Sequence, residues 1–118
     1  MLLLLAACSG TAAQEVRYAG PMMPEEKCSE PGHATLVVTG TQASFVANDG
    51  AVILPARVDP DGRLSGQLVI AGGDKKPFPL RLEGLVTADT ASGTYATPRC
   101  RFALSLTRVR LGLFGGAD

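Results

Sequence analysis

The fold is decided by one stretch in the second half of the chain, Phe78-Pro79-Leu80-Arg81-Leu82-Glu83-Gly84-Leu85-Val86. Its apolar residues Phe78, Leu80 and Leu82 alternate with exposed-type residues, of which Arg81 and Glu83 are charged. A period of two is typical of a β-strand that turns one face to a core and the other to solvent. Such one-sided strands belong to antiparallel sheets.

Similar runs flank this stretch on both sides, and short turns rich in glycine, proline or aspartate separate them. The predicted strands are 16–19, 34–38, 43–47, 52–58, 64–70, 78–86, 93–96 and 101–108. Short links make neighbouring strands antiparallel. We therefore expect an all-β domain, an antiparallel meander of 7–8 short strands that forms a small barrel, with a β-sandwich as the alternative. Glycines inside three of the strands favour closure, since glycine permits the bends of a barrel.

The segment from Gly20 to Gly32 contains three prolines, and we expect it to be a long loop. Two adjacent methionines in it, Met22 and Met23, have two readings. They pack over the core, or they form an exposed surface for a partner, since methionine adapts to irregular contacts.

Composition excludes some functions. The chain of 118 residues has 11 basic and 11 acidic residues and a pI near 6.6. A nucleic-acid-binding protein usually needs a strongly basic face. We therefore expect no nucleic-acid partner.

No catalytic or metal-binding constellation is recognisable. The single histidine, His33, has no nucleophile and acid in a motif around it, as a triad would require. A zinc site would need three or four clustered ligands. We expect no enzyme activity, no cofactor and no metal.

The N-terminus carries an apolar run, Leu2–Ala7, that ends in Leu5-Ala6-Ala7-Cys8 and is followed by Ser9. This resembles the lipobox of bacterial lipoproteins, in which a signal peptide is cut before a cysteine that takes lipid. The resemblance implies a lipid anchor at Cys8, with residues 1–7 as the end of a signal segment that begins upstream. Ser9 after the cysteine implies the outer membrane, facing the periplasm or the cell surface. The alternative is a cytosolic protein with an apolar N-terminus.

If Cys8 carries lipid, Cys28 and Cys100 remain. An even remainder in an oxidising compartment fits one disulfide, which we expect between Cys28 and Cys100. Two buried thiols are the alternative.

The last strand has arginines at its two ends, and Arg99 and Arg101 fall on its outer face if the alternation holds. They are either an ordinary solvated face or a patch for lipid phosphates or a partner's carboxylates. With Met22 and Met23 they are the candidate partner-binding residues. Phe45, Phe78 and Phe102 should fill the interior.

The expected organisation is a signal segment 1–7, a tether 8–15, one β domain 16–110 and a tail 111–118. The domain resembles, in architecture alone, the small disulfide-bonded β-barrel lipoproteins of Gram-negative envelopes, some of which inhibit lysozymes or proteases. Fold analogy does not carry function. The expected function is a non-enzymatic binding or structural module of the envelope, attached to the membrane at Cys8 and facing an envelope protein. The alternatives are an inhibitor of a hydrolase and a carrier of a small apolar ligand.

Overall fold

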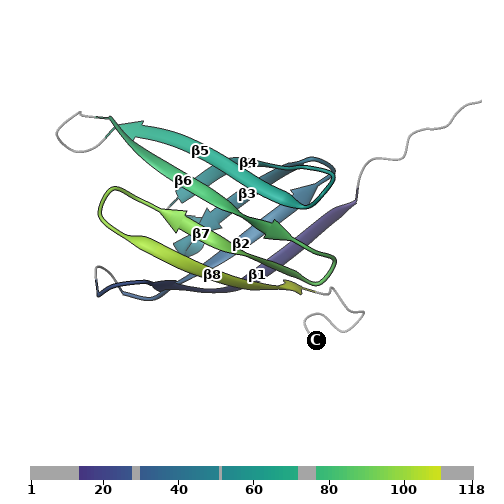
Figure 1. Ribbon diagram of the computed structural model, residues 1–118, viewed down its shortest axis with the longest axis horizontal. Helices are drawn as coiled ribbons and strands as arrows, with labels where there is room; N and C mark the ends of the chain where they lie inside the picture. The colour runs from purple at the N-terminus through teal and green to yellow at the C-terminus, as the bar shows by residue number, and fades with distance from the viewer. Residues whose placement is uncertain (1–13, 28–29, 51, 72–76, 110–118) are drawn as a thin grey trace, which may run out of the picture.

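A computed structural model describes residues 14–27, 30–50, 52–71 and 77–109 as an eight-stranded closed barrel (Figure 1). The strands are β1 (Glu15–Pro24), β2 (Gly32–Thr39), β3 (Gln42–Ala47), β4 (Val52–Val58), β5 (Arg63–Ala71), β6 (Pro77–Val86), β7 (Thr90–Ala96) and β8 (Arg101–Val109). A short 3-10 turn, η2 (Asn48–Gly50), follows β3.

Each strand pairs antiparallel with the next one along the chain, and β1 also pairs with β8. The predicted meander barrel is confirmed. The sandwich alternative is wrong, because pairing of the first strand with the last leaves no second sheet. Two rims result. The proximal rim holds the start of β1 and the end of β8, and the distal rim holds the end of β1 and the start of β8.

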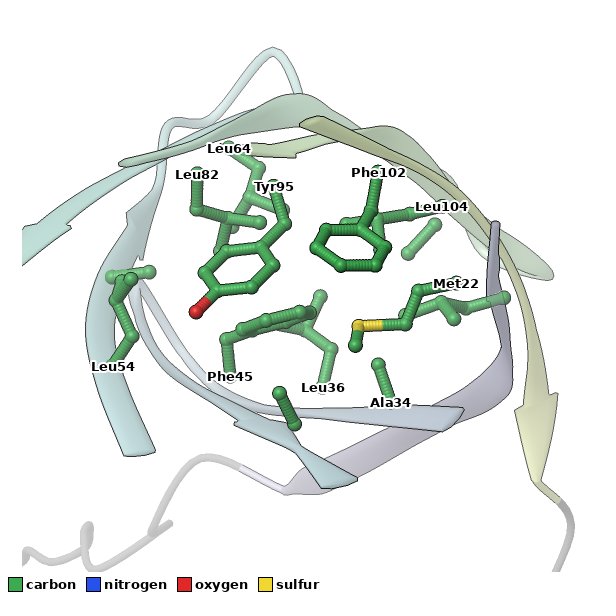
Figure 2. Packing of buried hydrophobic residues seen from close by; sticks show 14 of the residues in the cluster. Met22, Ala34, Leu36, Phe45, Leu54, Leu64, Leu82, Tyr95, Phe102 and Leu104 are labelled. Carbon is green, nitrogen blue, oxygen red and sulfur yellow. The ribbon is translucent and has the colours of Figure 1, made fainter. Parts of the chain in front are cut away.

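The interior is packed with side chains (Figure 2). Eighteen hydrophobic residues of the described ranges are buried there, and the largest fully enclosed ones among them are Phe45, Met22, Leu36, Leu54, Leu80 and Leu82. The Tyr95 ring lies 5.1 Å from that of Phe45 and 5.8 Å from that of Phe102, measured between centroids. Fully burying one large side chain contributes roughly 1.5–3 kcal/mol. The expected inward aromatics are present, although Phe78 is only half-buried.

The predicted loop from Gly20 to Gly32 is wrong in its first part, because β1 continues to Pro24. Gly20, Pro21 and Met22 lie opposite Ala34, His33 and Gly32 of β2. Burial of Met22 against the core outweighs the weak strand preference of glycine and proline, since β-propensity depends mainly on packing.

Glycine is required where β6 and β7 meet. Gly84 lies opposite Gly93, and a Cβ on either residue would collide with a backbone carbonyl oxygen of the facing strand, that of Ser92 or of Glu83. The close approach of the two backbones at this point explains why both positions lack a side chain.

Candidate functional site

Three of the four candidate partner-binding residues gather at one corner of the distal rim. Met23 lies on β1 opposite Ala103 of β8, and Arg101 begins β8. Just beyond β1, the backbone N–H of Glu25 donates to the carbonyl oxygen of Arg101 at 2.8 Å. We call this surface the β1–β8 corner, and it comprises Met23, Glu25, Glu26, Arg99 and Arg101.

Met22 does not belong to the corner. Its side chain lies among the core residues (Figure 2). The Met22 side chain is 1% exposed, whereas that of Met23 is 49% exposed. The expectation that Met22 binds a partner is wrong. Because the strand continues through both residues, its period of two sends them to opposite faces.

The turn before β8 is held by one threonine. Thr97 donates its backbone N–H to the Cys100 carbonyl oxygen at 2.8 Å, and its hydroxyl accepts from the Arg99 and Cys100 amides at 3.2 and 3.0 Å. A side-chain oxygen that accepts from the following amides fixes a tight turn. The backbone that carries Arg99 is therefore fixed in place.

A hollow of about 320 Å³ lies at this corner, lined by Glu25, Glu26, Pro98, Arg99 and Arg101 together with Thr97 and Cys100. Carboxylates and guanidinium groups thus share one exposed surface. Mixed charge suits a polar partner surface with both signs better than a uniformly anionic one.

Of the three cysteines, the structure describes Cys100. Cys8 and Cys28 lie outside the described residues, so lipidation and the Cys28–Cys100 bridge stay predictions. Cys100 is buried, 8% exposed. The hydrogen bond between Glu25 and Arg101 brings the chain three residues before Cys28 beside the residue that follows Cys100. This neighbourhood is compatible with a bridge.

Sequence reasoning missed a second hollow, on the outer face of β4, β5 and β6. It measures about 440 Å³ and is lined by Pro55, Ala56, Arg57, Ser65, Gly66, Gln67, Arg81, Leu82 and Glu83. Arg57 lies opposite Ser65, and Arg81 lies opposite Gln67. Only the pairing register brings Arg57 and Arg81 to one place, and alternation within each strand gave no signal of it.

Two tyrosines have raised pKa values. Desolvation raises the pKa of Tyr18, and the nearby Arg108 guanidinium partly opposes this; burial raises the pKa of Tyr95. The Tyr18 hydroxyl donates to the Thr87 carbonyl oxygen at 2.7 Å. Both phenols therefore stay protonated at neutral pH and serve the packing of the barrel.

Within the described ranges, no three His, Cys, Asp or Glu residues come close enough together to hold a metal ion. The same ranges contain no helix that is long and apolar enough to cross a membrane. His33 is exposed on β2, opposite Pro21.

A scan against protein-family models and searches of curated proteins and of solved structures find no match to this chain.

Proposed function

We propose that the protein is a non-enzymatic lipoprotein of the bacterial envelope, held at Cys8 and binding an envelope protein through the β1–β8 corner. The observation that carries the proposal is that Arg99 and Arg101 line one exposed hollow, with Met23 exposed on the adjoining strand β1. An exposed methionine beside arginines is a composition that protein interfaces favour.

The position of the corner supports this reading. β1 begins at Glu15, seven positions after Cys8. A segment of that length spans at most about 25 Å when extended. It enters the barrel at the proximal rim, and the β1–β8 corner lies on the distal rim. In a lipid-anchored protein the corner therefore faces away from the attachment point, toward other envelope proteins.

The packed interior supports an outer binding surface over the carrier function. A carrier needs an enclosed space of some hundreds of Å³ lined by apolar groups. The part of the barrel that the structure describes is filled by Phe45, Tyr95, Phe102 and the aliphatic residues around them. Binding of a partner is therefore expected at an exposed surface of the barrel.

The anchor is tested by the intact mass of the mature protein isolated from the envelope. The proposal expects a chain that begins at Cys8 and carries the added mass of a diacylglyceryl group. It expects Cys8→Ser to abolish both the cleavage and the lipid. An uncut, unmodified chain in the cytosol would overturn the proposal.

The binding surface is tested by site-specific photo-crosslinking in intact cells. A crosslinking residue replaces Arg101 at the corner, and the same residue replaces Arg63 on the proximal rim as the matched control. One specific adduct from position 101 and none from position 63 is expected. A hydrolase as the captured protein would favour the inhibitor function. Equal adducts from both positions, or none from position 101, would contradict the assigned surface.

A further inference from the structure

On the distal rim, β4 and β5 diverge. Among the residues that the structure describes, these strands pair only at Ala56–Gly66, Arg57–Ser65 and Val58–Leu64. Residues 52–55 of β4 pair only with β3, and residues 67–71 of β5 pair only with β6. We call these two diverging segments the β4–β5 fork.

Pro55 explains why the ladder stops. The Asp59 N–H donates to the Arg63 carbonyl oxygen at 2.9 Å, which assigns the hydrogen-bonded pairs of β4 and β5 to odd-numbered residues. After Arg57–Ser65 the next such pair would be Pro55–Gln67. Proline has no N–H to donate, so this pair cannot form fully.

The same alternation leaves a bare edge on β5. The N–H and C=O groups of Gln67, Val69 and Ala71 point toward β4, while those of Leu68 and Ile70 point toward β6. Over residues 67–71 the described strand pairing provides no partner on the β4 side. An exposed edge of this kind is a template for an added strand.

The neighbouring edge of β6 is protected in a way that the β5 edge is not. At the distal rim β6 extends beyond β7, since Arg81 is the first of its residues with a partner there, Ala96. In that extension the positions that would donate toward β7 are Pro77 and Pro79. Two prolines remove both donors, a common protection of natural edges. β5 has no proline and no charged residue between Leu64 and Ala71.

Apolar side chains surround the fork on both faces. Ile53 and Val69 point outward and are 59% and 55% exposed, values far above those of the core. Val52, Leu68, Ile70 and Phe78 point inward and are only half-buried. A strand inserted here would cover apolar groups with side chains of both faces.

The second hollow lies where the fork narrows. Pro55 and Gln67, the residues at the narrow end of the fork, line it together with Arg57, Arg81 and Glu83. Within the described residues, no ion pair of Arg57 or Arg81 is present. Two guanidinium groups and one carboxylate give the hollow a net positive charge, which favours a carboxylate ligand.

We propose that the fork binds the C-terminal segment of a partner protein as an added strand, with the terminal carboxylate between Arg57 and Arg81. β5 runs from the proximal to the distal rim, so a strand antiparallel to it runs inward and ends where the fork narrows. It cannot continue, because a Cβ placed on Gly66 would already lie 2.7 Å from the Pro55 carbonyl oxygen and from a methyl carbon of Leu54. The carboxyl terminus of the bound strand therefore lies beside Arg57 and Arg81. This site is independent of the lipid anchor and of the β1–β8 corner.

The test uses the purified chain and a fluorescein-labelled heptapeptide, Lys-Thr-Val-Thr-Val-Thr-Val, made with a free C-terminal carboxylate or with a C-terminal amide. Fluorescence anisotropy should show saturable binding of the acid and at least tenfold weaker binding of the amide. Arg57→Gln combined with Arg81→Gln should remove that difference, and Arg63→Gln, outside the hollow, should preserve it. Equal binding of acid and amide, or no binding of the acid at millimolar concentration, would overturn the proposal.

Val69→Pro removes one N–H from the bare edge and none from the β5–β6 ladder, and it should weaken binding at least tenfold. Amide exchange of the unmodified protein gives a second readout that requires no variant. The acid peptide should slow exchange at Val69 and Ala71 and leave Leu68 and Ile70 unchanged. Protection of Val69 that rises with protein concentration in the absence of peptide would assign the edge to a second copy of this chain and overturn the proposal.

Discussion

The closed barrel has two strand junctions that each contain a proline at a hydrogen-bonding position, and only at one of them does the pairing resume past the proline. At the β1–β8 junction the pairs resume after Pro21, with Met22, Met23 and Pro24 opposite Leu104, Ala103 and Phe102. At the β4–β5 junction the described residues form no pair on the far side of Pro55. A missing N–H interrupts a ladder, but what surrounds it decides whether the strands stay together.

The surroundings differ in burial and in what holds the strand ends. Beyond Pro21 the next inward residue is Met22, which is fully buried, and the Glu25–Arg101 hydrogen bond follows. The last pair before Pro55 is Ala56–Gly66, in which Gly66 has no side chain, and the inward residues of β5 beyond it, Leu68 and Ile70, are only half-buried. The β1–β8 junction is the one near which we expect the Cys28–Cys100 bridge.

Loss of the expected bridge should have the largest effect. Cys28→Ser combined with Cys100→Ser should lower the free energy of unfolding by about 4 kcal/mol, because a long closed loop restricts the unfolded chain. Urea denaturation followed by circular dichroism measures it. An unchanged midpoint, or two alkylatable thiols in the native exported protein, would show that no bridge supports the β1–β8 junction.

Truncation of Met22 should rank second. Met22→Ala should cost about 3 kcal/mol, since it leaves a cavity beside Phe102 and Leu104 in the core. Met23→Ala, one residue along and exposed, is the matched control and should stay within about 0.5 kcal/mol. Similar losses for both variants would contradict the continuation of β1 through these residues.

Adding a side chain at Gly66, in the β4–β5 junction, should have the third-largest effect on stability. Gly66→Ala should cost about 2 kcal/mol, because its Cβ meets Pro55, Leu54 and Ala56 at distances under 3.0 Å. Ser65→Ala, at the adjacent exposed position, is the control. If Gly66→Ala is as stable as the control, β4 and β5 are not in close contact at that residue.

Tyr18 gives a smaller, pH-dependent effect on the β1–β8 junction, where it lies opposite Arg108. Tyr18→Phe should cost about 1 kcal/mol at neutral pH through the lost hydrogen bond to Thr87. The folded-state pKa of Tyr18 lies above the ordinary value of 10.0, so the unfolded chain loses this proton first as the pH rises. Its contribution is therefore complete below pH 10 and is lost above it. A wild-type and Tyr18→Phe difference that does not shrink above pH 10 would contradict this assignment.

The barrel could be predicted because the sequence signals that determine it are local. The alternation around Leu80 and Leu82 and the short turns determine strands, faces and order without reference to distant residues. The end of β1 was not predictable in this way, since Pro21 and Gly20 favour a loop locally and the burial of Met22 depends on β2 and β8. That error also hid the difference between Met22 and Met23.

The candidate sites also differ in whether local sequence patterns could predict them. Arg101 was placed correctly on the outer face by alternation alone. The fork was not predictable, because the consequence of Pro55 depends on which residue of β5 stands opposite it. Arg57 and Arg81 likewise line the same hollow only because of the register of three strands.

Residue-resolved amide exchange of the unliganded protein tests the contrast between the two junctions most directly. The Met23 N–H points toward β8, and those of Val69 and Ala71 point into the fork. We expect exchange at Val69 and Ala71 to be at least 100-fold faster than at Met23, because hydrogen-bonded core strands open only with a large part of the global unfolding energy. Equal protection at the three amides would show that β4 and β5 stay paired as far as the distal rim, and would contradict the account.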